Sequence, residues 1–190
     1  MRIIAGAAKG RPIDAVASST RPTSDRAREA LFSTLTSEFG DFDGLHVLDL
    51  YAGTGAIALE ALSRGAAVVH SVENNDHAVA AINKNLDSIK SARFEGTFHL
   101  YAMSVHRFLQ DSAPIKYHFI YIDPPYDVSD IDVTETLIQL RDGGYLHQSA
   151  LIAVERNSRV KELLWPEGYE ALREKNYGQA VIFYGVPEEK

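Results

Sequence analysis

The 190-residue sequence contains no cysteine. This absence excludes a cysteine nucleophile, a cysteine-bound zinc site and a cysteine-ligated iron–sulfur cluster. It suits the reducing cytoplasm, which is the compartment we expect for this protein. The sequence also has no apolar run approaching the roughly 20 residues of a membrane span. Its amino-terminal apolar stretch is interrupted by Lys9, too early for a signal peptide.

The seven histidines are scattered without the spacing of metal ligands, so no metal site is expected. Internal repeats and low-complexity segments are absent as well. The length predicts one compact domain, and 45% hydrophobic and 24% charged residues are ordinary for a globular protein with a full core. We divide it into a basic amino-terminal hairpin and helix extension, 1–40, and a main unit, 41–190.

Positive charge is concentrated at the amino terminus, although the formal net charge is −7. Residues 1–28 hold six basic and two acidic residues, a balance of +4, whereas the remainder has a balance of −11. A basic arm on an acidic body suggests contact with a polyanion, and an ordinary solvated terminal segment is the alternative. The six basic residues are Arg2, Lys9, Arg11, Arg21, Arg26 and Arg28.

Strand and helix patterns alternate from residue 45 to residue 156. Strands with two apolar faces joined by helices predict a mostly parallel sheet covered on both sides. Expected strands are 44–50, 67–75, 97–104, 117–123 and 150–156, with a final antiparallel hairpin over 169–185. Expected helices are 21–39, starting at Thr23 or Ser24, then 56–66, 76–89, 104–111 and 132–144. The fold class is therefore α/β, with an amino-terminal hairpin over 2–15.

A glycine turn follows the first of these strands in "VLDLYAGTGAIALE". Asp49 ends the strand, Gly53 and Gly55 lie in the turn, and Glu73 ends the next strand. Ligands of open α/β sheets bind beyond the carboxyl ends of strands, and a carboxylate there can accept hydrogen bonds from both ribose hydroxyls. The pattern predicts a nucleoside-containing cofactor, and a plain strand–turn–helix corner is the alternative.

Two cofactors fit this turn. Gly53-x-Gly55-x-x-Ala58 matches the loose dinucleotide fingerprint, which would imply NAD and an oxidoreductase. S-adenosylmethionine (SAM) has no phosphate and carries a positive sulfonium. The Asp49 carboxylate beside the glycines suits this cation better than a pyrophosphate, which favours SAM.

The stretch "HFIYIDPPYD" ends a buried strand with Asp123-Pro124-Pro125-Tyr126. A residue before proline is held extended, so the Asp123 carboxylate and the Pro124 carbonyl can face one pocket. Two neighbouring acceptors suit the two protons of an exocyclic amine, Tyr126 offers a face for base stacking, and Asp123 can receive a proton. An Asp-Pro turn without chemistry is the alternative for a lone "DPP".

At these residues the chain resembles a known family. Asp/Asn-Pro-Pro-Tyr/Phe with a turn like "DLYAGTG" is the pattern of SAM-dependent amino methyltransferases, and "DPPY" alone is shared by adenine, cytosine, guanine and glutamine amine methylators. "MRIIAGAAKGR", "RPTSDRAREALF" and "DLYAGTGAIALEALSRGA" with "DPPY" narrow the resemblance to the RsmD family of bacterial small-subunit ribosomal RNA guanine-N2 methyltransferases. The resemblance runs from residue 1 to about 156, with a looser tail.

The resemblance implies a Rossmann-like fold with a seven-stranded sheet, SAM as cofactor and S-adenosylhomocysteine as product. Implied SAM contacts are Asp49, Gly53, Gly55, Glu73, Asn74, Ser104 and Asp123, and implied amine chemistry falls on Asp123, Pro124, Pro125 and Tyr126. Ser104 stands where many relatives have an acidic or amide residue that binds adenine. Arg21, Pro22 and Thr23 match the segment expected over the active site.

The implied partner is ribosomal RNA in a small ribosomal subunit or assembly intermediate, bound by a monomer. Methylation of another exocyclic amine, adenine N6 or cytosine N4, is the nearest alternative. An NAD-dependent oxidoreductase and a non-catalytic RNA-binding protein are more distant ones. The oxidoreductase leaves "DPPY" and the basic arm without a role.

Overall fold

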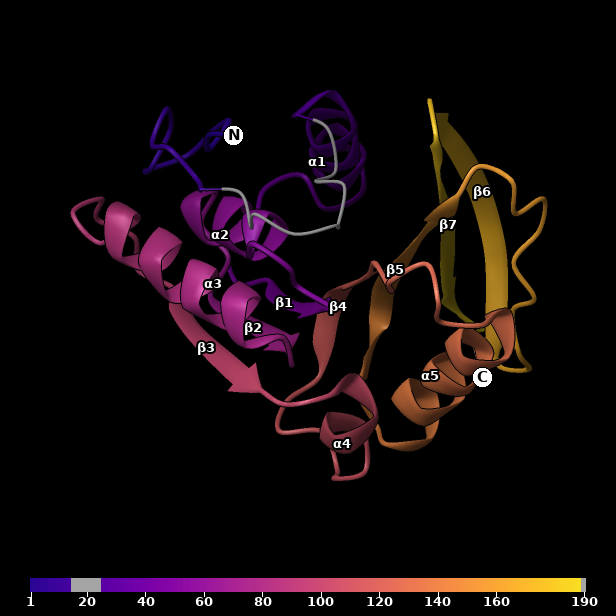
Figure 1. Cartoon of the computed structure of the whole chain (residues 1–190). Coiled ribbons are helices and arrows are strands. Elements are labelled where there is room, and N and C mark those ends of the chain that lie inside the picture. Colours follow the sequence, from indigo (N-terminus) through magenta and orange to yellow (C-terminus); the bar gives the residue numbers. More distant parts are fainter. Residues whose placement is uncertain (15–24, 189–190) are drawn as a thin grey trace.

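The computed structural model describes residues 1–14 and 25–188 (Figure 1). Within them, the helices are α1 (Asp25–Phe39), α2 (Ala56–Ser63), α3 (Asp76–Ile89), α4 (Val105–Leu109) and α5 (Asp130–Asp142). The strands are β1 (His46–Leu50), β2 (Val68–Glu73), β3 (Thr97–Ala102), β4 (Tyr117–Ile122), β5 (Leu146–Asn157), β6 (Tyr169–Tyr177) and β7 (Ala180–Pro187). No helix of these described segments is both long and apolar enough to cross a membrane.

The described strands form one seven-stranded sheet in the order β3-β2-β1-β4-β5-β7-β6. Strands β1 to β5 pair in parallel, and β7 runs antiparallel between β5 and β6. The right-hand side of Figure 1 shows the β6–β7 hairpin extending this sheet. The expected fold class, a Rossmann-like sheet ending in an antiparallel hairpin, is confirmed.

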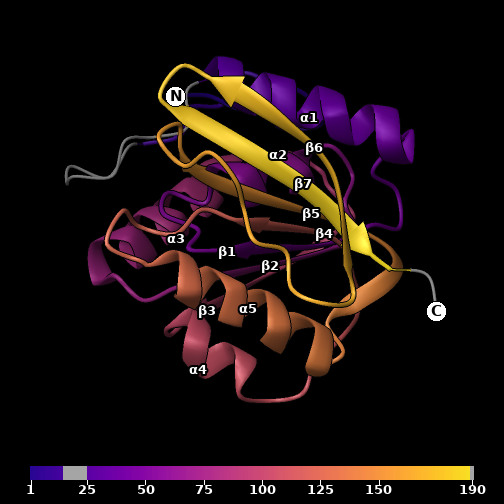
Figure 2. The same ribbon diagram turned by 90° about the vertical axis from the view of Figure 1, so that its right-hand side faces the viewer.

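Helices cover both faces of the sheet, because alternate side chains of the central strands point to opposite faces. On one face, α1 and α2 pack with the amino-terminal residues in one core cluster, represented by Phe32, Leu59 and Ile3. On the other face, α4 and α5 form a second cluster, represented by Phe108 and Leu137. Figure 2 shows α1 above the sheet and α4 and α5 below it.

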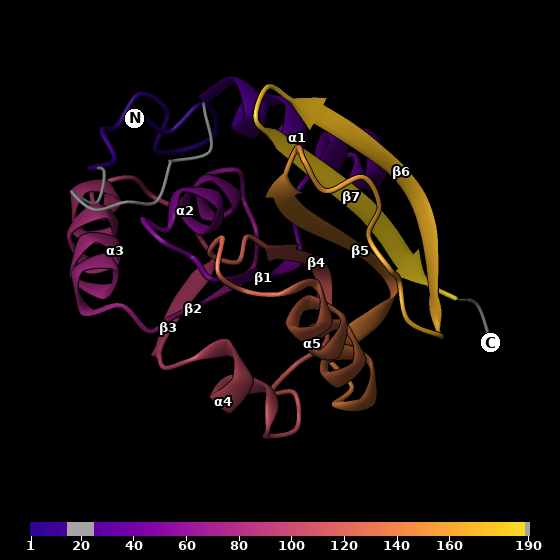
Figure 3. The same cartoon turned by 45° about the vertical axis from the view of Figure 1, so that its right-hand side comes forward.

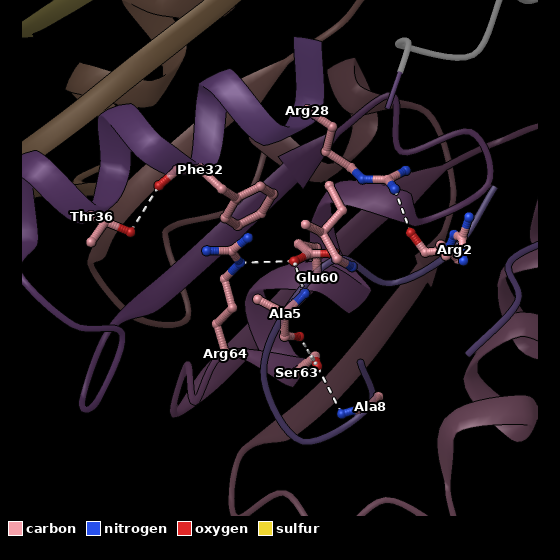
Figure 4. Close-up of polar contacts among 10 residues, drawn as sticks. Arg2, Ala5, Ala8, Arg28, Phe32, Thr36, Glu60, Ser63 and Arg64 are labelled. Carbon is pink, nitrogen blue, oxygen red and sulfur yellow. Dashed lines mark hydrogen bonds and ion pairs between the residues drawn. The ribbon is translucent and has the colours of Figure 1, made fainter. Parts of the chain in front are cut away.

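The amino-terminal segment, residues 1–14, lies beside α2 and α3 (Figure 3) and is hydrogen-bonded to both helices. The buried carboxylate of Glu60 on α2 accepts hydrogen bonds from the backbone N–H of Ile4 at 2.7 Å and Ala5 at 3.0 Å. The Ser63 hydroxyl donates to the Ala5 carbonyl at 2.6 Å and accepts from the Ala8 N–H at 2.9 Å. Figure 4 shows these contacts on one side of α2. The basic segment is therefore a docked part of the fold.

Several boundaries differ from the sequence-based expectation. The expected amino-terminal hairpin is short: an antiparallel bridge joins Arg2 and Pro12, flanked by hydrogen bonds of 2.9 Å from the Ile3 N–H to the Arg11 carbonyl and from the Ile13 N–H to the Met1 carbonyl. Strand β5 begins at Leu146, before the expected start at Ala150. The sequence did not reveal this earlier start, because the first residues of the strand are mostly polar. Helix α5 begins at Asp130 because Ser129 caps it. The proposed cap of α1 at Thr23 or Ser24 falls outside the described residues.

Candidate active site

The site lies where the strand order reverses. Strand β1 is flanked by β2 on one side and by β4 on the other, and its last residue, Leu50, pairs with Ile122 at the end of β4. The Asp123 N–H donates to the Leu50 carbonyl at 3.4 Å. The glycine turn after β1 and the Asp-Pro-Pro-Tyr segment after β4 thus start side by side. This is the position where open α/β sheets bind ligands.

Unusual backbone geometry shapes the glycine turn. Gly53 and Gly55 have φ angles of 56° and 74°, in the left-handed region that glycine adopts without strain. A β-carbon at Gly55 would also lie 3.2 Å from the Ile82 side chain of α3. Tyr51, with φ of 60°, is the described non-glycine residue with positive φ. Backbone strain of this kind concentrates at functional sites. The sequence pattern gave no sign of the positive φ at Tyr51.

Glu73 connects the ends of β1 and β2. One carboxylate oxygen accepts from the Gly53 N–H at 2.8 Å, and the other accepts from the N–H groups of Asn74 and Asn75 at 2.9 Å each. The structure therefore brings Glu73 and the glycine turn together, as the sequence predicted. The Asn74 side chain is exposed beside them. The neighbouring Asn75, which sequence reasoning passed over, caps α3 by accepting from the His77 and Ala78 N–H groups.

Asp49 lies beneath the turn with 1% of its surface exposed. Its carboxylate accepts a hydrogen bond from the Ala58 N–H at 3.2 Å, in the first turn of α2. Burial, assisted by the charge of Glu73, raises the pKa of Asp49 to about 8, although the Ala58 hydrogen bond opposes the shift. A positive ligand beside Asp49 would offset this cost of burying a carboxylate.

Asp123 belongs to the same group of carboxylates. Burial raises its pKa well above the ordinary 3.8, and the charges of Glu155 and Asp49 raise it further, whereas Arg156 lowers it. Glu155, at the end of β5, accepts a hydrogen bond from the Tyr121 hydroxyl. Sequence reasoning missed Glu155 and Arg156. A signal was available, because both end the parallel strand next to β4.

The segment after Asp123 projects from the sheet. Pro124 is buried, Pro125 is exposed, and Tyr126 is 68% exposed, an unusual position for a large aromatic ring. The Val128 N–H donates to the Pro125 carbonyl at 3.0 Å, which closes a turn. This arrangement leaves the Tyr126 ring free to stack on a ligand.

Arg156 fastens the end of this loop to β5. Its guanidinium donates to the Val128 carbonyl at 3.0 Å and to the Asp130 carboxylate at 2.8 Å. Only 9% of the Arg156 side chain is exposed, so this ion pair is shielded on one side. Arg156 therefore helps to position the loop that carries Tyr126.

Ser104 lies after β3, at the same rim of the sheet, and serves as the cap of α4. Its hydroxyl oxygen accepts from the Arg107 N–H at 3.2 Å. The side chain is partly exposed, and the hydroxyl hydrogen can still be donated to a ligand. Its helix-capping role explains a serine here without any ligand.

The six basic residues predicted to bind RNA separate into three groups. Arg2, Lys9, Arg11 and Arg26 are exposed. Arg28 is fully buried and donates to the Arg2 carbonyl, so in this structure it cannot contact a phosphate. The prediction that Arg28 binds RNA is therefore corrected, and Arg28 is assigned a structural role. Its position on a helix, beside exposed residues, gave no sign in the sequence that it would be buried. Arg21, like Pro22 and Thr23, lies outside the described residues.

The donor set can be tested against the two cofactors. Four carboxyl groups lie around one end of the sheet, those of Asp49, Glu73, Asp123 and Glu155. The charge of Glu73 raises the pKa of Asp49, and the charges of Glu155 and Asp49 raise the pKa of Asp123. This environment repels a pyrophosphate and attracts a cation. The residues therefore fit SAM, with its sulfonium and ammonium groups, better than NAD. No cluster of His, Asp and Glu that could bind a metal occurs among residues 1–14 and 25–188.

Comparison with known proteins agrees with this geometry. A family model described as conserved hypothetical protein 95 matches residues 1–185. The chain is 34% identical over 181 residues to "Ribosomal RNA small subunit methyltransferase D" of Escherichia coli (strain K12), covering 94% of this chain and 86% of that protein. The protein of the same name from Haemophilus influenzae is 31% identical over 180 residues, covering 94% and 89%.

A solved structure has the same architecture. It is a candidate methyltransferase, yhhF, from Escherichia coli, with a TM-score of 0.84 and 31% sequence identity. The match covers 99% of this chain and 98% of that chain. The similarity therefore includes the amino-terminal segment and the carboxy-terminal hairpin as well as the central sheet.

Proposed function

Because the chain belongs to the RsmD family, whose model matches residues 1–185, we propose that it methylates the exocyclic N2 amine of a guanine in small-subunit ribosomal RNA. The chain is a SAM-dependent ribosomal RNA methyltransferase. The choice of guanine N2 follows the resemblance to the family, whereas methyl transfer to an exocyclic amine rests on one observation above all. Asp123 and Pro124 adjoin the glycine turn, within a group of carboxyl groups that suits a cationic cofactor.

The cofactor side of the site is assigned to the rim around β1 and β2. SAM supplies a methyl group made electrophilic by its positive sulfur. Glu73 accepts hydrogen bonds from the ribose hydroxyls while it also holds the Gly53 N–H. Gly53 and Gly55 leave room for close approach, and Asp49 balances positive charge. Asn74 and Ser104, both on the same rim, are assigned to the adenosine end.

The substrate side is assigned to the segment after β4. The Asp123 carboxylate and the Pro124 carbonyl accept one hydrogen bond each from the target amine, which orients it for in-line attack. These bonds favour a pyramidal nitrogen and return electron density to its lone pair. Tyr126 stacks on the base, which has to leave its own stack to enter the pocket. Asp123, with its raised pKa, then takes the proton released by the methylated nitrogen.

The exposed basic residues of the amino-terminal segment and of α1 are assigned to phosphate contacts. Arg2, Lys9, Arg11 and Arg26 contribute positive charge on a chain with a net charge of −7. Because Glu60 and Ser63 hold the segment on α2, these charges are presented by a fixed surface. We further propose that the protein acts as a monomer, in the cytoplasm, on a ribosomal particle.

The experiment compares modified nucleosides of ribosomal RNA from a strain lacking the gene with those from the parent strain. Mass spectrometry should show the loss of one N2-methylguanosine from small-subunit RNA. The wild-type gene should restore it, and the Asp123→Asn variant should not. Loss of N6-methyladenosine or N4-methylcytidine would assign a different amine. An unchanged nucleoside profile would contradict ribosomal RNA as the substrate.

A further inference from the structure

One polar side chain interrupts the buried stripe of α3. Ala78, Ile82, Asn85 and Ile89 are the buried residues of this helix, and Asn85 is 1% exposed. A buried amide needs hydrogen-bond partners, since an unpaired one costs more than a pair contributes. The partners of Asn85 therefore identify what it connects.

The Asn85 amide joins two segments that are distant in sequence. Its oxygen accepts from the Asp14 N–H at 2.8 Å, and its nitrogen donates to the Asp14 carbonyl at 3.2 Å. The same nitrogen donates to the carbonyl of Thr54, between the two glycines of the turn, at 3.0 Å. One side chain thus holds the end of the amino-terminal segment and the middle of the glycine turn.

Helix α3 also approaches the glycine turn closely one helical turn before Asn85. Ile82, three residues before Asn85, lies where a β-carbon on Gly55 would be only 3.2 Å from it. Movement of the turn therefore has to move α3 or break its contact with the helix. The amino-terminal segment has further anchors at Glu60 and Ser63, but these attach it to α2 and not to the turn.

We propose that Asn85 is a positioning residue that couples SAM binding at the glycine turn to the order of the basic amino-terminal segment. The inference rests on the proposed function and deepens it, because it makes the cofactor and the RNA-binding surface depend on each other. When SAM fixes the turn, the Thr54 carbonyl is fixed, and with it the Asn85 amide and the Asp14 backbone. By linkage, order in the segment raises the affinity for SAM by the same factor.

A core asparagine that merely satisfies its own amide would also be buried and hydrogen-bonded. Hydrogen exchange separates the two roles, because a merely structural residue does not transmit the effect of a ligand. Backbone amide exchange of residues 3–14 is measured with and without SAM on the protein alone. SAM should slow exchange in this segment by at least about fivefold, the lower end of ordinary coupling.

Asn85→Asp is the first variant. The carboxylate can still accept from the Asp14 N–H, but it has no N–H to donate to the Thr54 and Asp14 carbonyls. SAM should then no longer slow exchange in residues 3–14, and the dissociation constant of SAM should rise by about fivefold or more. Asn85→Ser, whose shorter side chain cannot span both carbonyls, should act in the same direction.

Two controls lie beside Asn85 on the same helix. Asn83→Asp makes the same chemical change at an exposed position. Lys84→Gln removes the exposed ion pair between Lys84 and Asp14, at 2.5 Å, without touching the turn. Both should keep the response of residues 3–14 to SAM.

The outcomes distinguish the inference from the proposed function. Calorimetry that detects no SAM binding to the wild type would contradict both. SAM binding that protects the glycine turn but leaves exchange in residues 3–14 unchanged would overturn the coupling alone, even if both Asn85 variants failed to fold. Equal responses of Asn85→Asp and Asn83→Asp would assign the coupling to some other contact.

Discussion

Asp123 is the residue whose chemistry is most specific. Replacement by asparagine keeps its shape but removes the carboxylate that accepts a proton. In the proposed reaction, Asp123→Asn should lower single-turnover methyl transfer by at least about 100-fold. The dissociation constant of SAM should stay within about threefold, because Asp49, Glu73 and the turn are unchanged. Calorimetry measures the affinity, and rapid quench with labelled SAM measures the transfer.

Asp127→Asn is the matched control for this change. Asp127 is exposed in the same loop, four residues after Asp123. Its replacement removes a nearby carboxylate without removing the proposed base. Near-normal transfer by Asp123→Asn, or an equal loss in Asp127→Asn, would remove Asp123 from its proposed role.

The carboxyl groups around Asp123 set a pH dependence. Only ionised Asp123 accepts a proton, so kcat/KM for SAM should fall as the pH falls through the pKa of this group in the free enzyme. Burial, Glu155 and Asp49 raise that pKa, so the acid limb should lie well above 3.8. Glu155→Gln removes one negative charge and should move the limb to lower pH. A limb that stays in place would show that another group controls it.

At the scale of the helices and strands, the order of elements could be predicted from sequence. Buried strands and the glycine turn of "VLDLYAGTG" have strong local signals, and the carboxyl ends of parallel strands meet at one rim. These signals suffice to predict that Asp49, Glu73 and Asp123 lie together at that rim. The start of β5 lacked such a signal, because "LHQS" is polar and its pairing is set by β4.

Contacts between distant elements could not be predicted in the same way. Glu60 and Asn85 are ordinary polar residues of helices in the sequence, and nothing local shows that they bind the backbone of residues 4–5 and 14. Arg28 was misassigned for the same reason, since a basic residue can be exposed or buried on α1. Burial is a property of the packed elements, and helical spacing alone does not determine it for a charged residue.

The amino-terminal segment offers a test of its docking. A β-carbon on Gly6 would lie 1.8 Å from the Ser63 carbonyl oxygen, whereas one on Gly10 would meet nothing within 4 Å. Both glycines have positive φ, 79° and 83°, so alanine is strained by about 1–2 kcal/mol at either position. Gly6→Ala should destabilise the protein by at least about 1 kcal/mol more than Gly10→Ala.

Urea unfolding measures this difference through the midpoint at constant slope. Gly10→Ala is the control, because it carries the same backbone strain without the collision. Equal midpoints for the two variants would mean that the segment detaches from α2 at little cost.

For the whole molecule, the uneven charge predicts how RNA binding responds to salt. Each lysine or arginine that meets a phosphate releases counterions, so affinity falls with salt in proportion to the contacts. Replacing four exposed basic residues by glutamine should reduce the slope of log affinity against log salt by about 3–4 units on duplex RNA, or nearer 3 on single strands. These residues are Arg2, Lys9, Arg11 and Arg26.

Binding to small ribosomal subunits from the deletion strain is measured from low to moderate salt. The control variant changes the net charge equally through four other exposed residues, Arg107, Lys116, Arg159 and Lys161. It should lower the slope much less. Parallel slopes for the wild type and the amino-terminal variant would place the RNA on another surface.

The close carboxyl groups also lower the stability of the folded protein when no cofactor is bound. An aspartate whose pKa is raised on folding stabilises the folded state least when it is ionised, so this contribution is fully present below about 3.8 and is lost as the pH rises through the raised value. At neutral pH, Asp123→Asn removes part of this repulsion. Without SAM, the inactive variant should therefore have a higher melting temperature than the wild type. The wild-type protein would then be less stable because it keeps the carboxylate that its activity requires. A lower melting temperature would show that Asp123 stabilises the empty site.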